Sequence, residues 1–215
     1  MRNYYKLLLA HALSCLMLLQ LSAGERSYVI PQLAPGMEQI ETLLNGAWNF
    51  KPSLKSGWTT IQVPGEVVMQ GYAIEHDQAF RYRKSFVLPD SYRNKRVILR
   101  FDGVYSHACL AVNGKKVREH FGGFTRWETD ITSYVKIGKK NEIELEVTDR
   151  LDDISYASGY AHHPIGGILR DVTIFALPET HIFDFYAETV LDASYKNAVL
   201  KLGYSAFASE EAEIR

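Results

Sequence analysis

The chain has 215 residues, of which 47% are hydrophobic and 23% are charged, a balance typical of a folded globular protein. Its 24 basic and 25 acidic residues leave a formal net charge of -1. Bulk electrostatics therefore favour no polyanion, and we expect no nucleic-acid partner. The length also excludes a (β/α)₈ barrel accompanied by another domain, because a barrel alone needs roughly 250 residues.

The N-terminus has the residue order of a secretory signal. A basic start is followed by an apolar run from Leu7 to Leu21 and then by the small residues Ser22–Gly24. Two polar residues interrupt the run, and a bilayer span needs about 20 apolar residues. We expect residues 1–24 to be a signal peptide, with the protein exported to the periplasm or the extracellular space and without a membrane span. A lipoprotein acylated at Cys15 is the alternative, although the residues before Cys15 form a poor acylation signal.

Removal of the signal would leave Cys109 as the single cysteine. An intramolecular disulfide is then impossible, and stability has to come from a hydrophobic core. Because Cys109 lies within the apolar segment Ala108–Val112, we predict a buried, inert thiol and no thiol chemistry.

Period-two alternation of apolar and polar residues dominates the chain from Gly57 onward and predicts β-strands. Helix is expected only at Met37–Leu44 and Glu66–Gln70. Asn113-Gly114 indicates a tight hairpin, because both residues tolerate positive φ. The predicted strands include Phe80–Leu88, Arg96–Phe101, Ala108–Val112, Lys115–His120, Glu142–Val147, Ile168–Leu177, Ile182–Leu191 and Val199–Phe207.

Many short strands separated by turn signals predict an all-β chain, a β-sandwich of the jelly-roll type. Pro178 should end this strand system. The residues after it start another, which is too short for the roughly 100 residues of an immunoglobulin-like sandwich. We expect residues 25–179 to form the jelly roll and residues 180–215 the first strands of an incomplete immunoglobulin-like domain.

The sequence contains no motif for a catalytic nucleophile, a zinc site or a phosphate-binding loop. Adjacent histidines at 162 and 163 do not complete a metal site, and an acidic loop with aspartates at 149, 152 and 153 matches no calcium-loop spacing. No metal and no cofactor is expected. Five aromatic rings in or beside predicted turns are candidates for stacking on a sugar, although core packing is the more common role of such rings: Trp58, Tyr105, Phe124, Trp127 and Tyr160.

Eight short motifs between residues 44 and 172 occur in an order that resembles the N-terminal sugar-binding domain of glycoside hydrolase family 2, the family of β-galactosidases, β-glucuronidases and β-mannosidases. Each motif alone is weak, and their order makes the resemblance specific. They are Leu44–Phe50, Trp58 with Ile61–Gly65, Tyr82–Phe86, Val97–Val104, Ala111–Gly114, Gly122–Phe124, Asp130–Thr132 and Gly166–Val172.

The resemblance implies a jelly roll followed by an immunoglobulin-like sandwich and a TIM barrel that carries two catalytic glutamates. This chain would then be the N-terminal, sugar-binding portion of an exported hydrolase, truncated and inactive by itself, and we expect no catalytic residue in it. Whether the chain is an enzyme stays open on the sequence. The implied partners are an oligosaccharide or glycoside and a C-terminal catalytic domain.

One departure from the family pattern concerns the sugar site. Several members carry an aspartate six residues before the second glycine of the Gly-Gly-Ile segment, where this chain has Ala161. His162 and His163 are candidates to replace it, because a neutral imidazole both donates and accepts. We predict His162, His163, Arg170 and Asp77 as substrate-binding residues. Arg170 has a second interpretation, a domain contact in which it pairs with a nearby aspartate at 171 or 149.

Two functions of other classes remain as alternatives. A stand-alone carbohydrate-binding module would bind glycans without any catalytic domain. An interaction or structural protein would use the exposed strand edge expected at the incomplete second sandwich. The sequence does not identify the sugar, the linkage or the anomer.

Overall fold

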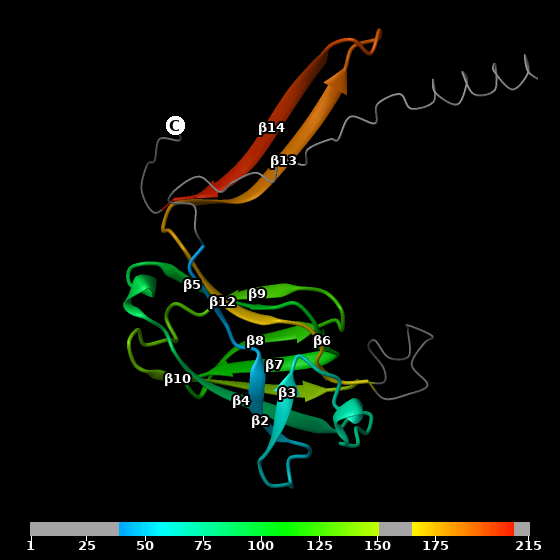
Figure 1. The fold of residues 1–215 in the computed structure, drawn as a ribbon, viewed down its shortest axis with the longest axis vertical. Coiled ribbons are helices and arrows are strands. Elements are labelled where there is room, and N and C mark those ends of the chain that lie inside the picture. The colour runs from blue at the N-terminus through cyan, green and yellow to red at the C-terminus, as the bar shows by residue number, and fades with distance from the viewer. Residues whose placement is uncertain (1–38, 151–164, 209–215) are drawn as a thin grey trace, which may run out of the picture. The chain divides into compact units, whose positions relative to one another are not determined.

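The structure, a computed structural model, describes residues 39–150 and 165–208. These residues form an all-β protein whose main body is a sandwich of two antiparallel sheets (Figure 1). The all-β fold and the sandwich expected from the sequence are confirmed. Two one-turn 3₁₀ helices, η1 (Val68–Gln70) and η2 (Asp90–Tyr92), lie between strands.

The larger sheet has six strands in the order β3-β2-β4-β10-β7-β8. Its central pair, β4 and β10, is matched over nine residues from Ala79 opposite Thr148 to Val87 opposite Lys140. The strands are β2 (Gly46–Lys51), β3 (Thr59–Val63), β4 (Ala79–Val87), β7 (His107–Val112), β8 (Lys115–Phe121) and β10 (Lys140–Thr148).

The second sheet has four strands in the order β1-β12-β5-β9. A separate short ladder joins β6 to β11. The strands are β1 (Glu41–Leu43), β5 (Arg96–Phe101), β6 (Val104–Tyr105), β9 (Trp127–Asp130), β11 (Gly167–Ile168) and β12 (Val172–Leu177).

Alternation along the strands explains how the two sheets enclose a core. In β10, Ile143, Leu145 and Val147 are fully buried, whereas the glutamates between them lie on the outer face. In β2, Trp48 and Phe50 share the inner face and are 1% and 0% exposed. The rings of Phe50 and Tyr82 lie 5.0 Å apart, so aromatic packing holds the centre of the six-stranded sheet.

The predicted hairpin at Asn113-Gly114 is confirmed. It joins β7 to β8, and both residues have positive φ, 50° at Asn113 and 77° at Gly114. Gly166 and Gly167 lie at positions where neighbouring side chains approach the backbone closely. Gly167 has φ 121°, and a methyl group there would lie 2.6 Å from the Tyr82 hydroxyl. A methyl group at Gly166 would lie 2.6 Å from Ile74.

Three expectations about secondary structure were wrong. The segment expected to form a helix at Met37–Leu44 contains β1, which pairs with β12 across the chain. The expected helix at Glu66–Gln70 is reduced to η1. The single strand expected at Ile168–Leu177 is two strands, because residues 169–171 leave the ladder. The short strands β6 and β9 were not predicted.

The hairpin of β13 (His181–Leu191) and β14 (Ala198–Phe207) follows Pro178, close to the two predicted strands. One face carries Phe185, Leu200, Leu202 and Tyr204 in register, while Glu188 and Lys201 form an ion pair on the other face. That this hairpin begins an immunoglobulin-like domain stays a prediction, as do the domain boundaries. Within the described ranges, no helix has the length and apolar character to cross a membrane.

Candidate functional site

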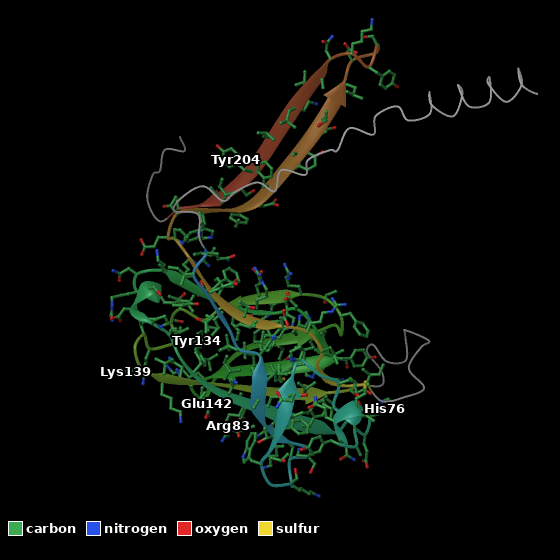
Figure 2. All side chains as sticks on the ribbon, viewed as in Figure 1. His76, Arg83, Tyr134, Lys139, Glu142 and Tyr204 are labelled. Atoms are coloured by element: carbon green, nitrogen blue, oxygen red, sulfur yellow. The ribbon has the colours of Figure 1, made fainter. Side chains whose placement is uncertain are left out.

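Four strands of the large sheet end in one transverse row, where Thr148 lies opposite both Ala79 and His107, and His107 lies opposite Phe121. The segments that extend past this row form what we call the loop end: residues 71–78, 105–106, 122–126 and 149–150. Figure 2 shows His76 at this end of the sandwich and Lys139 at the opposite end. The sheet thus gathers loops from distant parts of the sequence.

A contact between a histidine and a buried aspartate anchors two of these loops. The Nδ1 atom of His76 lies 2.8 Å from Oδ2 of Asp149, whose side chain is completely buried. The backbone N–H of Asp77 donates to the carbonyl of Asp149 over 2.9 Å. These two contacts join the loop before β4 to the end of β10.

Ser106 ties the same strand end to β7. Its hydroxyl donates to the carbonyl of Thr148 over 3.2 Å and accepts from the backbone N–H of Arg150 over 3.1 Å. Its own carbonyl accepts from the N–H of Gly122 over 3.0 Å. Ser106 is fully buried, and these three bonds satisfy its hydroxyl and its carbonyl.

The other side of the loop end is aromatic. Tyr105 is buried and its ring centroid lies 5.3 Å from that of Phe124, which is 53% exposed. A methyl group at Gly123 would overlap the Tyr105 ring, so only glycine lets the backbone pass there. Phe124 therefore presents an exposed apolar ring on a fixed base.

Arg170 lies next to this aromatic pair. Its Nη1 donates to the carbonyl of Phe124 over 3.2 Å, and its side-chain stem lies close to Gly103. The pairing expected with an aspartate at 171 or 149 was wrong within the described residues. Asp171 instead accepts from the Asn45 amide over 2.8 Å, and Asp149 pairs with His76. Arg170 is thus held by a backbone acceptor and keeps further N–H donors available.

Asp77, the other predicted binding residue among those described, is exposed and lies on the opposite flank of the loop end. It lines a hollow of about 300 Å³ together with Ser53, Leu54, Lys55, Gln78 and Ala79. Its φ of 60° is a left-handed conformation that aspartate tolerates better than most residues. Arg170 and Asp77 therefore belong to the same end of the sandwich without forming one compact cluster.

His162 and His163 lie outside the described residues, and so does Tyr160. Sequence reasoning missed His76 as a member of this end, because a single histidine in a loop carries no pattern. Asp149 was noticed only as part of an acidic loop, and its burial against His76 depends on strand pairing. Within residues 39–150 and 165–208, no group of three or more His, Cys, Asp or Glu side chains is placed to hold a metal ion.

The candidate aromatic rings divide into two kinds. Trp127 is 4% exposed and stacks on Phe101 at 4.6 Å, and Tyr105 is 1% exposed, so both belong to the interior. Trp58 is 40% exposed and Phe124 is 53% exposed. The two exposed rings remain candidates for sugar stacking.

Cys109 was expected to be buried, and this expectation was wrong. It lies half-exposed on the outer face of the large sheet, with Sγ 3.9 Å from Nε2 of His107. Partial burial and the negative charges of Glu119 and Glu146 raise the pKa of its thiol. We therefore still expect low reactivity, although the side chain is not completely buried.

Comparison with known proteins places this architecture in a family. Residues 38–178 match the family model described as "Glycosyl hydrolases family 2, sugar binding domain". The chain therefore belongs to glycoside hydrolase family 2 and contains the sugar-binding domain of that family.

Two curated relatives illustrate the relationship. A β-galactosidase of Thermoanaerobacter pseudethanolicus is 35% identical over 150 residues, covering 66% of this chain and 20% of the relative. A β-glucuronidase of Bacteroides fragilis is 30% identical over 154 residues, covering 67% of this chain and 22% of the relative. The chain thus spans about a fifth of the length of these relatives.

Solved structures agree with the fold. The β-D-glucuronidase of Dictyoglomus thermophilum has a TM-score of 0.63 at 23% identity, over 82% of this chain and 34% of that one. The β-glucuronidase of Ruminococcus gnavus has a TM-score of 0.68 at 20% identity, over 84% of this chain and 35% of that one. At these identities the similarity concerns the fold alone.

Proposed function

We propose that this chain is the sugar-positioning module of an exported family 2 glycoside hydrolase acting on β-galactoside-like or β-glucuronide-like glycans. In this proposal, the loop end forms one wall of a sugar site, and the two catalytic glutamates belong to a separate barrel domain. The 215-residue chain by itself would not hydrolyse glycosides.

The observation that carries the proposal is the anchoring of the loop end. Ser106 and the pair of His76 with Asp149 fix the loops to the end of the sheet, while Phe124 and Arg170 present an exposed ring and N–H donors. Groups held in place before binding lose little conformational entropy when a ligand arrives. Fixed groups remote from bond cleavage raise a rate by orienting the substrate.

The first test assays the purified chain on chromogenic β-galactosides and β-glucuronides. We expect no turnover above the buffer rate. Turnover that scales with the concentration of the chain would overturn the claim that it is inactive alone.

The second test uses a chimera in which residues 38–178 replace the corresponding domain of the Bacteroides fragilis β-glucuronidase. A folded, active chimera should lose affinity on Arg170→Ala, seen as a KM raised by about tenfold, corresponding to the loss of one charge-assisted hydrogen bond. Arg93→Ala is the matched control, because Arg93 is 59% exposed and bonds only locally to Asp90. Equal KM values for the two variants would contradict the role of Arg170.

Export rests on the signal-like order of the first 24 residues. Expression with these residues in a Gram-negative host should yield periplasmic or secreted protein whose N-terminus begins after Ala23 or Gly24. Full-length protein retained in the cytoplasm, with Met1 or Arg2 at its start, would contradict export.

A further inference from the structure

The outer face of the six-stranded sheet carries transverse rows of polar side chains. In one row, register places Thr60 opposite Asn49, Asn49 opposite Arg83 and Arg83 opposite Glu144. The row continues through Ala111 to Lys116 and so crosses the whole sheet. The neighbouring row contains Lys51, Arg81, Glu146, Cys109 and Glu119. We call this surface the outer face; it is separate from the loop end.

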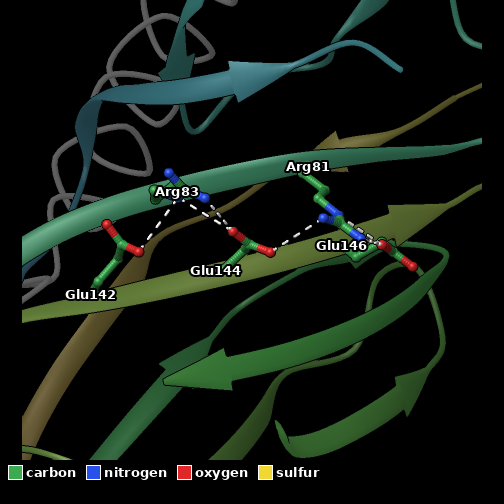
Figure 3. Close-up of polar contacts among 5 residues, drawn as sticks. All are labelled: Arg81, Arg83, Glu142, Glu144 and Glu146. Atoms are coloured by element: carbon green, nitrogen blue, oxygen red, sulfur yellow. Dashed lines mark hydrogen bonds and ion pairs between the residues drawn. The ribbon is translucent and has the colours of Figure 1, made fainter. Parts of the chain in front are cut away.

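An ion-pair ladder holds the middle of the outer face in place. Arg83 lies between Glu142 at 3.4 Å and Glu144 at 2.7 Å, and Arg81 lies between Glu144 at 3.6 Å and Glu146 at 2.6 Å (Figure 3). These side chains are 29–42% exposed, so they are accessible as well as ordered. Each carboxylate has acceptor positions left over, and each guanidinium has donors left over.

An aromatic ring next to the start of β3 covers Arg83 in this ladder. The guanidinium carbon of Arg83 lies 4.2 Å from the centroid of the Trp58 ring. Because Trp58 remains 40% exposed in this arrangement, Arg83 supports the indole on one side and a large part of the ring is open to solvent. An indole supported in this way is a rigid apolar platform beside ordered hydrogen-bonding groups.

A hollow lies beside Glu144 and Glu146, on the side of the ladder toward β7 and β8. It has a volume of about 150 Å³, and Ala111 and Cys109 form its floor between the Glu144 and Glu146 side chains and Lys116. The small residues and the irregular register between Leu110 and Ala111 make room there. From the β2 strand to the β7 strand the surface extends over three strand spacings, about 14 Å.

The charges on the outer face select the ligand chemistry. Basic residues Lys51, Arg81, Arg83, Lys116 and Lys140 are nearly balanced by acidic residues Glu119, Glu142, Glu144 and Glu146. A surface with so little net charge gives little advantage to a polyanion or a polycation. It suits a ligand that combines many hydroxyl groups with apolar C–H faces.

We propose that the outer face is a second carbohydrate-binding site, which takes a neutral polysaccharide chain with one sugar ring stacked on Trp58. Hydroxyl groups of the following sugars donate to Glu144 and Glu146 and accept from Arg81 and Arg83. The site lies outside the loop end and does not depend on the catalytic domain. It would keep the protein on polymeric substrate while the loop end meets a chain terminus.

Affinity electrophoresis of the 215-residue chain in gels containing soluble xylan, galactan, mixed-linkage β-glucan or polygalacturonate tests the proposal. We expect retardation by at least one neutral polysaccharide and weaker retardation by polygalacturonate. Trp58→Ala should weaken the binding about tenfold or more, as truncation of a tryptophan anchor does. Tyr195→Ala is the matched control, because Tyr195 is 79% exposed in the turn between β13 and β14 and should leave the retardation unchanged.

A second variant and a spectroscopic measurement separate loss of the site from loss of the fold. Ala111→Gln fills the hollow without touching Trp58 and should also weaken retardation, while both variants keep the thermal transition of the wild type. Trp58 is the single exposed tryptophan of the three, since Trp48 and Trp127 are 1% and 4% exposed. Bound polysaccharide should therefore protect the fluorescence from acrylamide quenching.

Three results would overturn the proposal. The first is wild-type mobility that none of the neutral polysaccharides changes. The second is retardation that a folded Trp58→Ala variant retains in full. The third is retardation by polygalacturonate alone, which would identify the surface as a polyanion site.

Discussion

The side-chain amide of Asn113 donates to Oδ1 of Asn141 over 2.9 Å, and so links the β7–β8 turn to the start of β10. Asn141 is 1% exposed, and its Oδ1 also accepts from the N–H of Lys136. Its Nδ2 donates to the carbonyls of Lys136 and Lys139. The buried side-chain amide of Asn141 therefore makes four hydrogen bonds, which connect β10 to the β7–β8 turn and to the loop that precedes β10.

Asn141→Ala should destabilise the protein by about 2–4 kcal/mol, because it removes these bonds and leaves buried backbone groups without partners. Chemical denaturation measures the effect. Lys139→Ala is the control, since the Lys139 backbone and not its exposed side chain takes part, and it should change stability by less than about 0.5 kcal/mol. A loss below about 1 kcal/mol in Asn141→Ala would contradict the role of this amide.

Gly167→Ala should destabilise by about 2–4 kcal/mol. The new methyl group would lie 2.6 Å from the Tyr82 hydroxyl and 2.9 Å from Val67, at a φ of 121° that other residues rarely adopt. Gly114→Ala isolates the backbone effect, because its φ is also positive but no atom lies within 4 Å of the added methyl group. We expect Gly114→Ala to lower the free energy of unfolding by about 1 kcal/mol. Thermal or denaturant unfolding measures both variants, and equal losses in Gly167→Ala and Gly114→Ala would argue against crowding at Gly167.

Asp192 should titrate at low pH. Hydrogen bonds from the Asn197 amide, from the Ser194 hydroxyl and from backbone N–H groups lower its pKa to about 2. Because the folded pKa lies below the unfolded value of about 3.9, its contribution to the β13–β14 turn is present above that value and lost as the pH falls toward 2. Carboxyl carbon shifts followed by NMR measure this titration.

Asn197→Ala removes the largest of these contributions and should raise the pKa of Asp192. Ser205→Ala is the control, since Ser205 lies in β14 away from the turn. If Asn197→Ala left the titration midpoint unchanged, the hydrogen-bonded turn would not be the cause of the low value.

Cys109 should react slowly with iodoacetamide at neutral pH. Burial and the charges of Glu119 and Glu146 raise the pKa of its thiol, which reduces the thiolate fraction. In a Cys15→Ser background, Glu119→Gln should accelerate labelling by lowering that pKa. Lys116→Gln should slow labelling, because the positive charge of Lys116 acts in the opposite direction. Labelling rates that respond to neither change would contradict electrostatic control of this thiol.

Features coded by neighbouring residues were predicted well. The Asn113-Gly114 hairpin and the alternation of β10 depend on local φ preferences and on period two, both readable from a single segment. The helix predicted at Met37–Leu44 was wrong, because this segment contains β1, which is only three residues long and owes its conformation to pairing with β12. A helical spacing of apolar residues was the stronger local signal, and the distant strand outweighed it.

The candidate site shows the same division. Arg170 lies in one of the motifs that carry the family resemblance, but neither its partner nor the His76–Asp149 pair follows from spacing. Period two puts the glutamates of β10 on one face, but their pairing with Arg81 and Arg83 arises because β4 lies next to β10. Pairings of this kind require the sheet order, which no local pattern contains.

The pairing of β1 with β12 also affects how the protein is made. Thr42 lies opposite Ile174, and Asn45 bonds to Asp171 across 126 positions of sequence. The first strand of the sandwich therefore cannot pair until its last strand has been synthesised. A ribosome has to synthesise almost the whole domain before the four-stranded sheet can close. Native contacts so distant in sequence form slowly. The strands that will form this sheet therefore stay unpaired until late in synthesis, and unpaired strand edges favour aggregation.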